Sequence, residues 1–100
     1  MRYNKQEMAY LIGIDIGTTN TKALLYDPQQ GRVVDQAARP TPTDHPIPDW
    51  SQHDPEQLWQ TVADCLRQVA AGRPVAGLAV SSLAEAGVGL DEHGQPVYPI

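Results

Sequence analysis

The sequence predicts an α/β domain built on a mixed β-sheet, and three observations point to that class. An almost wholly apolar run at residues 10–15 ends in an acid, which is typical of a buried strand. Two further runs follow across turn-forming residues, which indicates two consecutive hairpins. One amphipathic helical pattern then precedes another apolar run at residues 75–80, which indicates a helical crossover to a parallel strand.

The first three strands are expected at residues 10–15, 22–26 and 32–38. The first is predicted to be central and buried on both faces, because its apolar run does not alternate with polar residues. A turn at residues 27–31 has Pro28 at the position where its fixed φ is favourable. The third run mixes polar and apolar residues, so it is expected at an edge of the sheet.

A connector at residues 39–48 contains four prolines, which favour an extended, semi-rigid backbone. The helix after it is expected to begin with Asp54 as N-cap, Pro55 in the first position and Gln57 three residues after the cap. Gly72 and Pro74 end it. Its apolar face is predicted to contain Leu58, Val62, Leu66 and Val69, widened by Trp59, Ala63, Cys65 and Ala70.

The remainder of the chain is expected to form one more buried strand and a hairpin. Residues 75–80 supply the strand, parallel to the first. Residues 87–90 and 95–100 flank a turn at residues 91–94. Residues 1–8 are polar and predicted to be disordered, which leaves residues 9–100 as one domain.

Composition excludes several classes of protein. Seven Lys and Arg against twelve Asp and Glu give a net charge of −5, which disfavours nucleic acid and anionic membrane surfaces as partners. The single Cys65 cannot form an intrachain disulfide, and no apolar run is long enough to span a membrane. A cytoplasmic location is therefore predicted.

The segment that indicates chemistry is IGIDIGTTNTK at residues 12–22. Asp15 at a strand end, followed by Gly17 and a run of small hydroxyl and amide residues, would place N–H groups and hydroxyls around one concavity suited to phosphate oxygens. Gly17 would let the backbone approach the ligand, and Asp15 would suit Mg²⁺. The alternative is a plain hairpin whose residues only satisfy the turn. The spacing fits neither a P-loop nor a Rossmann fingerprint.

Three segments in order resemble a known family. GIDIGTTNTKALLYD, at residues 13–27, resembles the first phosphate loop of the sugar kinase, heat-shock chaperone and actin ATPase superfamily. PDWSQHDPEQLW, at residues 48–59, and GLDEHGQPVYPI, at residues 89–100, resemble segments of the FGGY carbohydrate kinases. The resemblance implies part of the N-terminal lobe of a ribonuclease-H-like, actin-like ATPase fold, and phosphoryl transfer from MgATP to a sugar, polyol or sugar acid.

The resemblance also implies roles for individual residues. Asp15 matches the acid that helps to organise Mg²⁺. A phosphate-contacting loop is matched by Gly17, Thr18, Thr19 and Asn20, and a basic position near the phosphates by Lys22. For Lys22 a solvated strand lysine remains an equal alternative.

Trp50, Trp59 and Cys65 are predicted to be packing residues, and the histidines lack metal-like spacing.

Residues 81–87 match the segment in which family members contact the sugar, so Ser82, Ala84 and Glu85 are expected to bind substrate. Glu85 falls on a position that is acidic in glycerol kinases and histidine in many xylulokinases. Ala84 replaces the arginine of the glycerol kinases, and Leu83 replaces a glutamine common to both groups. The sequence is interpreted as closer to the xylulokinases, with glycerol and gluconate kinases as alternatives.

The general base and the adenosine site of such kinases belong to later segments, so the hundred residues are expected to be an N-terminal fragment that is inactive alone. The implied partners are ATP, Mg²⁺ and a small sugar or polyol, and the full-length enzyme could form a homodimer. The alternative function is an ATP-binding regulatory or chaperone-type ATPase module of the same superfamily.

Overall fold

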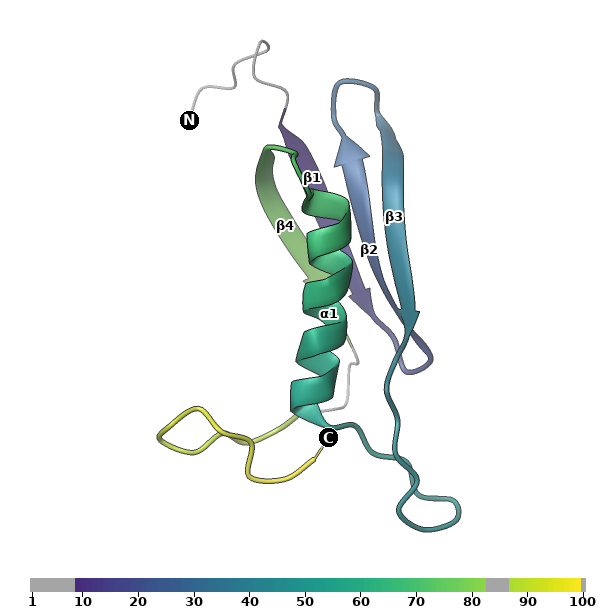
Figure 1. Cartoon of the computed structure of the whole chain (residues 1–100), viewed down its shortest axis with the longest axis vertical. Coiled ribbons are helices and arrows are strands. Elements are labelled where there is room, and N and C mark those ends of the chain that lie inside the picture. The colour runs from purple at the N-terminus through teal and green to yellow at the C-terminus, as the bar shows by residue number, and fades with distance from the viewer. Residues whose placement is uncertain (1–8, 83–86, 100) are drawn as a thin grey trace.

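The computed structural model describes residues 9–82 and 87–99, and within them it has the mixed α/β architecture that the sequence predicts. Strands β1 (Tyr10–Ile16), β2 (Asn20–Asp27) and β3 (Arg32–Pro40) precede helix α1 (Pro55–Ala70) and strand β4 (Val75–Ser81). The sheet order is β3-β2-β1-β4, in which only the β1–β4 pair is parallel. Strand β1 is therefore central and β3 lies at an edge, as expected, while α1 crosses one face of the sheet (Figure 1).

Strands β2 and β3 both extend two residues beyond their predicted bounds at the end near the β1–β2 loop. Asn20 pairs with Pro40 and Thr21 with Arg39. A proline is tolerated there because the outer side of an edge strand needs no ladder donor. The extra pairing brings the connector after β3 directly beside the loop that joins β1 to β2.

The β2–β3 turn forms as its residues predict. The carboxylate of Asp27 is almost fully buried and accepts hydrogen bonds from the N–H groups of Gln29, over 2.9 Å, and Gln30, over 3.3 Å. Gly31 adopts a φ of 67° and donates to the Asp27 carbonyl oxygen. Side-chain bonding by Asp27 and a left-handed glycine thus close this hairpin.

Helix α1 begins and ends where its punctuation indicates. The Asp54 side chain accepts a hydrogen bond from the N–H of Glu56 over 2.9 Å, which confirms it as the N-cap. At the other end Gly72 has a φ of 69°, and Arg73 N–H donates to the Ala70 carbonyl oxygen. The Arg73 guanidinium also bonds Asp35 of β3 over 2.7 Å, which holds the pKa of that carboxyl below its usual range.

The core lies between α1 and one face of strands β1 to β3. It consists of apolar side chains that alternate along each strand and recur on the helix: Ile12, Ile14, Ala23, Leu25, Ala37, Val62, Cys65 and Val69. Cys65 is the buried packing residue that was predicted, and burial raises the pKa of its thiol. A small thiol with a raised pKa is chemically inert at neutral pH.

Four burial predictions are wrong for the residues that the structure describes: those for two strands and for two tryptophans. Strand β1 is covered on one face only, so Leu11 is 41% exposed. Strand β4 is not buried, since Leu78 and Val80 are 56% and 57% exposed. The reason is geometric, because α1 packs mainly over β2 and β3 and leaves the β4 side of its own face uncovered. Trp59 and Trp50 were both expected to pack. Trp59 is 58% exposed on that side, and Trp50, between β3 and α1, is 56% exposed.

The predicted C-terminal hairpin is a turn with one bridge rather than two strands. Leu90 pairs with Pro96, and the Asp91 carboxylate accepts hydrogen bonds from the N–H groups of His93 and Gln95. Two prolines in the second arm supply no N–H groups for a longer ladder, which explains the difference. Residues 1–8, predicted to be disordered, lie outside the described residues.

No helix in the described ranges combines the length and the apolar character needed to cross a membrane.

Candidate phosphate site

Most of the predicted site lies at one end of the sheet. The β1–β2 loop, the end of β3 and the carboxyl end of β4 lie at the lower end of the sheet in Figure 1, and α1 begins below that end. Asp15 at the end of β1 pairs with Lys22 of β2 on one side and with Ser81 of β4 on the other. The fold therefore brings the phosphate motif and the start of the predicted sugar segment together.

The loop between β1 and β2 is closed by its own backbone. The N–H of Gly17 donates to the carbonyl oxygen of Asn20 over 2.9 Å. A Cβ atom at Gly17 would lie 2.8 Å from that oxygen, a distance that real Cβ atoms do not reach. Glycine is therefore required here for the loop's own closure, whereas the sequence interpretation assigned it to the approach of a ligand.

Thr18 and Thr19 supply the groups that could bind an anion. Both residues are exposed, as is Asn20. Among the described residues, the N–H groups and hydroxyls of Thr18 and Thr19 have no hydrogen-bond acceptor. Unpartnered donors gathered in one tight loop are suited to phosphate oxygens.

Asp15 and Lys22 are exposed neighbours on the face of the sheet opposite α1. The ion pairs of the described residues do not include them, so both charges remain available. This geometry supports the carboxylate as a Mg²⁺ ligand, because Mg²⁺ needs only one or two carboxylates beside phosphate oxygens and water. The described residues contain no cluster of three or more His, Cys, Asp or Glu that could hold a metal ion.

An open depression of about 270 Å³ adjoins Asp15 on this face. It exists because Gly13 carries no side chain and nothing lies within 4 Å of where its Cβ would be. Its other lining residues come from β1, β2 and β4: Ile14, Asp15, Leu24, Ala79, Val80 and Ser81. A concave surface thus joins the metal candidate to the end of β4.

The predicted substrate residues are only partly placed. Ser82 is exposed and follows β4 directly, close in the chain to the partner of Asp15. Ala84 and Glu85 lie outside the described residues, so their role as sugar contacts remains a prediction.

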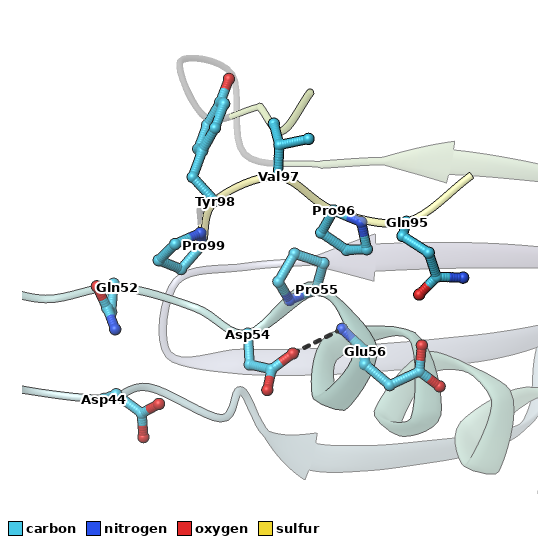
Figure 2. A pocket seen from close by; sticks show the side chains of 10 residues that line it. All are labelled: Asp44, Gln52, Asp54, Pro55, Glu56, Gln95, Pro96, Val97, Tyr98 and Pro99. Atoms are coloured by element: carbon cyan, nitrogen blue, oxygen red, sulfur yellow. Dashed lines mark hydrogen bonds between the residues drawn. The ribbon is translucent and has the colours of Figure 1, made fainter. Parts of the chain in front are cut away.

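A second pocket, of about 510 Å³, lies between the start of α1 and the C-terminal segment (Figure 2). Asp44, Asp54 and Glu56 line it on one side, and residues 95–99 line it on the other. Asp54 is occupied as the helix cap, as the dashed line in Figure 2 marks. Three carboxyl groups and no basic side chain in the lining make this pocket unsuited to phosphate. It shares no lining residue with the depression beside Asp15.

Two buried threonines behind the loop were missed by sequence reasoning. Thr41, in the proline-rich connector, donates its N–H to the Thr19 carbonyl oxygen and its hydroxyl to the Gly17 carbonyl oxygen. The Thr21 hydroxyl lies 3.0 Å from that of Thr41. No local pattern announces this contact, because it joins residues 20 positions apart in the chain.

The sequence profile described as "FGGY family of carbohydrate kinases, N-terminal domain" matches residues 10–100. The chain belongs to this family. Among curated FGGY relatives, a glycerol kinase of Acidovorax ebreus is 34% identical in a 97-residue alignment that covers 91% of this chain and 19% of that protein. The family match favours the kinase interpretation over the chaperone-type alternative.

Solved structures agree with the FGGY assignment. A xylulose kinase from Rhodospirillum rubrum superimposes with a TM-score of 0.79 at 34% identity, over 90% of this chain and 20% of its own. A gluconate kinase from Lactobacillus acidophilus gives 0.78 at 26% identity, over 92% and 19%. The fold is thus part of the N-terminal region of an actin-like ATPase fold, and the chain spans about a fifth of the length of these proteins.

Proposed function

We propose that this chain is the N-terminal part of an ATP-dependent carbohydrate kinase that transfers the γ-phosphate of MgATP to a hydroxyl of a sugar, polyol or sugar acid. The observation that carries the proposal is that Asp15, the donors of the β1–β2 loop and the end of β4 lie together at the carboxyl end of β1. Phosphoryl transfer depends on positioning and on charge stabilisation, and these residues offer groups for both.

Each group of residues at this end of the sheet has a proposed task. Asp15 would hold Mg²⁺, which when bound offsets the negative charge of the phosphates. The loop from Gly17 to Asn20 would receive the phosphate oxygens, and Lys22 would add a positive charge beside Asp15. Ser82, Ala84 and Glu85 would position the acceptor hydroxyl near Asp15.

The acceptor is proposed to be a xylulose-like sugar, with glycerol and gluconate as the competing acceptors. Both a xylulose kinase and a glycerol kinase are 34% identical to this chain, so overall similarity does not separate them. The test is a panel of pentuloses, polyols and aldonates assayed with MgATP and the full-length protein. Phosphorylation of one class identifies the acceptor, and turnover of none contradicts the proposed function.

Glu85→Ala tests the substrate segment in the same assay. Loss of a charge-assisted hydrogen bond to a sugar hydroxyl should raise the sugar KM by about 10-fold to 100-fold and change the ATP KM much less. Ser51→Ala, an exposed change between β3 and α1, serves as the control. An unchanged sugar KM would remove Glu85 from the substrate site.

The hundred residues alone are proposed to be inactive, in a protein that is cytoplasmic and that could act as a homodimer. The proposed inactivity and the proposed homodimer are supported by an open apolar groove of about 470 Å³ between α1 and β4. It is lined by Leu58, Trp59, Leu66, Leu78 and Val80, among others. Exposed apolar surface of this kind is normally covered by further chain or by a partner. Phosphorylation of any sugar by the isolated hundred residues would contradict this proposal.

A further inference from the structure

Thr41 joins the β1–β2 loop to the body of the molecule through both its backbone and its side chain. Its N–H donates to the carbonyl oxygen of Thr19 over 2.8 Å, and its hydroxyl donates to the carbonyl oxygen of Gly17 over 2.7 Å. The two acceptors are only two residues apart in the loop. One residue of the connector after β3 therefore holds the loop at two points.

The hydroxyl groups of Thr21 and Thr41 donate in series, from Thr21 to Thr41 and from Thr41 to the Gly17 carbonyl oxygen. A hydroxyl has a single proton to donate, and Thr41 gives its proton to the Gly17 carbonyl. Thr21 must therefore be the donor in its 3.0 Å bond to Thr41. Both side chains are buried, with Thr21 fully inaccessible and Thr41 6% exposed. Because water cannot readily reach these atoms, a lost hydroxyl would leave its partner unsatisfied.

Three carbonyl oxygens at the loop therefore already accept hydrogen bonds from other groups of the protein. Gly17 and Thr19 present theirs to Thr41, and Asn20 presents its own to the Gly17 N–H. A loop fixed in this way keeps its acceptors away from a bound anion. The N–H groups of Thr18 and Thr19, which have no acceptor among the described residues, remain for phosphate oxygens.

We propose that Thr41 is a positioning residue that holds the β1–β2 loop ready for the phosphates of ATP. The hydroxyl, and not the volume of the side chain, carries the effect. This inference rests on the proposed kinase function, and Thr41 lies outside the three segments that resemble the superfamily and the FGGY kinases. Preorganised donors bind an anion without first reordering the loop, so the loss should appear in ATP binding.

The test compares three variants of the full-length protein. Thr41→Val keeps the shape but removes the hydroxyl and is expected to raise the ATP KM by about tenfold while the sugar KM changes less than about twofold. Thr41→Ser restores the hydroxyl and should return the ATP KM to near the wild-type value. Thr61→Val is the matched control, because Thr61 is also buried and donates to a carbonyl, that of Gln57, within α1. It should lower stability and leave the ATP KM unchanged.

A second measurement reads the loop without catalysis. Hydrogen exchange at the Gly17 amide, referenced to the Ile14 amide in β1, should be about tenfold faster in Thr41→Val and unchanged in Thr61→Val. If Thr41→Val does not fold, Thr41→Ala removes the same hydroxyl without placing a methyl group in its position. Unchanged exchange together with an unchanged ATP KM would overturn the positioning role. A wild-type protein that phosphorylates nothing contradicts the proposed function instead, and the exchange result then stands by itself as the test of Thr41.

Discussion

The two faces of the sheet differ in what their side chains do. On the face beneath α1, residues such as Ile12, Ala23 and Leu25 are buried in a continuous core. On the opposite face Gly13 and Asp15 line a depression, and the charged side chains of Asp15 and Lys22 are exposed. Because side chains alternate along a strand, the same two strands supply both sets of residues. Substitutions on one face should therefore cost stability, and substitutions on the other should cost function.

The largest expected effect is on the open face. Asp15→Ala should reduce phosphorylation about a thousandfold or more, since a metal ion supplies several kcal/mol of charge stabilisation and each ~1.4 kcal/mol is a factor of ten in rate. Sugar binding and the unfolding midpoint should change little, because Asp15 is exposed and makes no ion pair with a described residue. Steady-state kinetics with MgATP and calorimetric sugar binding check this. An equal loss of phosphorylation and of sugar binding in a folded variant would show that Asp15 is not at the metal site.

The covered face should show the opposite result. Leu25 is fully buried beneath α1, so Leu25→Ala should lower the free energy of unfolding by about 2–5 kcal/mol through lost burial and a cavity. Denaturant unfolding of the full-length protein measures it. The kcat per folded molecule should stay near wild type. A large fall in kcat without a loss of stability would break the division between the two faces.

The β4 side of the covered face is the exception, because its apolar residues face a groove. Leu78→Ala should change stability by less than about 0.5 kcal/mol in the hundred-residue chain, where Leu78 is 56% exposed. In the full-length protein the same change should cost about 2 kcal/mol if further chain covers the groove. Val33→Ala, an exposed change on β3, is the control and should be small in both settings. Equal effects of Leu78→Ala in both proteins would show that the groove stays open.

The smallest effect belongs to the ion pair at the margin of the core. Arg73 lowers the pKa of Asp35, so this pair stabilises the fold above the ordinary carboxyl pKa of about 3.9 and loses its contribution as the pH falls through the lowered value. Arg73→Gln should raise the Asp35 pKa toward that ordinary value, as NMR titration would show. The stability difference between the two proteins should shrink in acid. A difference independent of pH would assign the effect to the Arg73 bond with the Val69 carbonyl instead.

Local chemistry explains which parts of the fold were predictable. The Asp27 turn and the Asp54 cap depend on residues within a few positions of each other, and both formed as expected. The burial of β4 was wrong because an apolar run reports what a strand is suited to, and not whether a neighbour is present to cover it. The C-terminal hairpin was overestimated because its prolines limit the ladder to one bridge.

The candidate site divides in the same way. The residues of the phosphate motif are contiguous, so the sequence by itself determined which side chains occupy the β1–β2 loop, and it identified the family that residues 10–100 match. Only the tertiary structure decided that Asp15 lies beside Ser81, that Gly17 is required by the Asn20 carbonyl, and that Thr41 supports the loop. These contacts join segments far apart in the chain or depend on atoms approaching within 3 Å. Neither kind of information is encoded in a local pattern of residues.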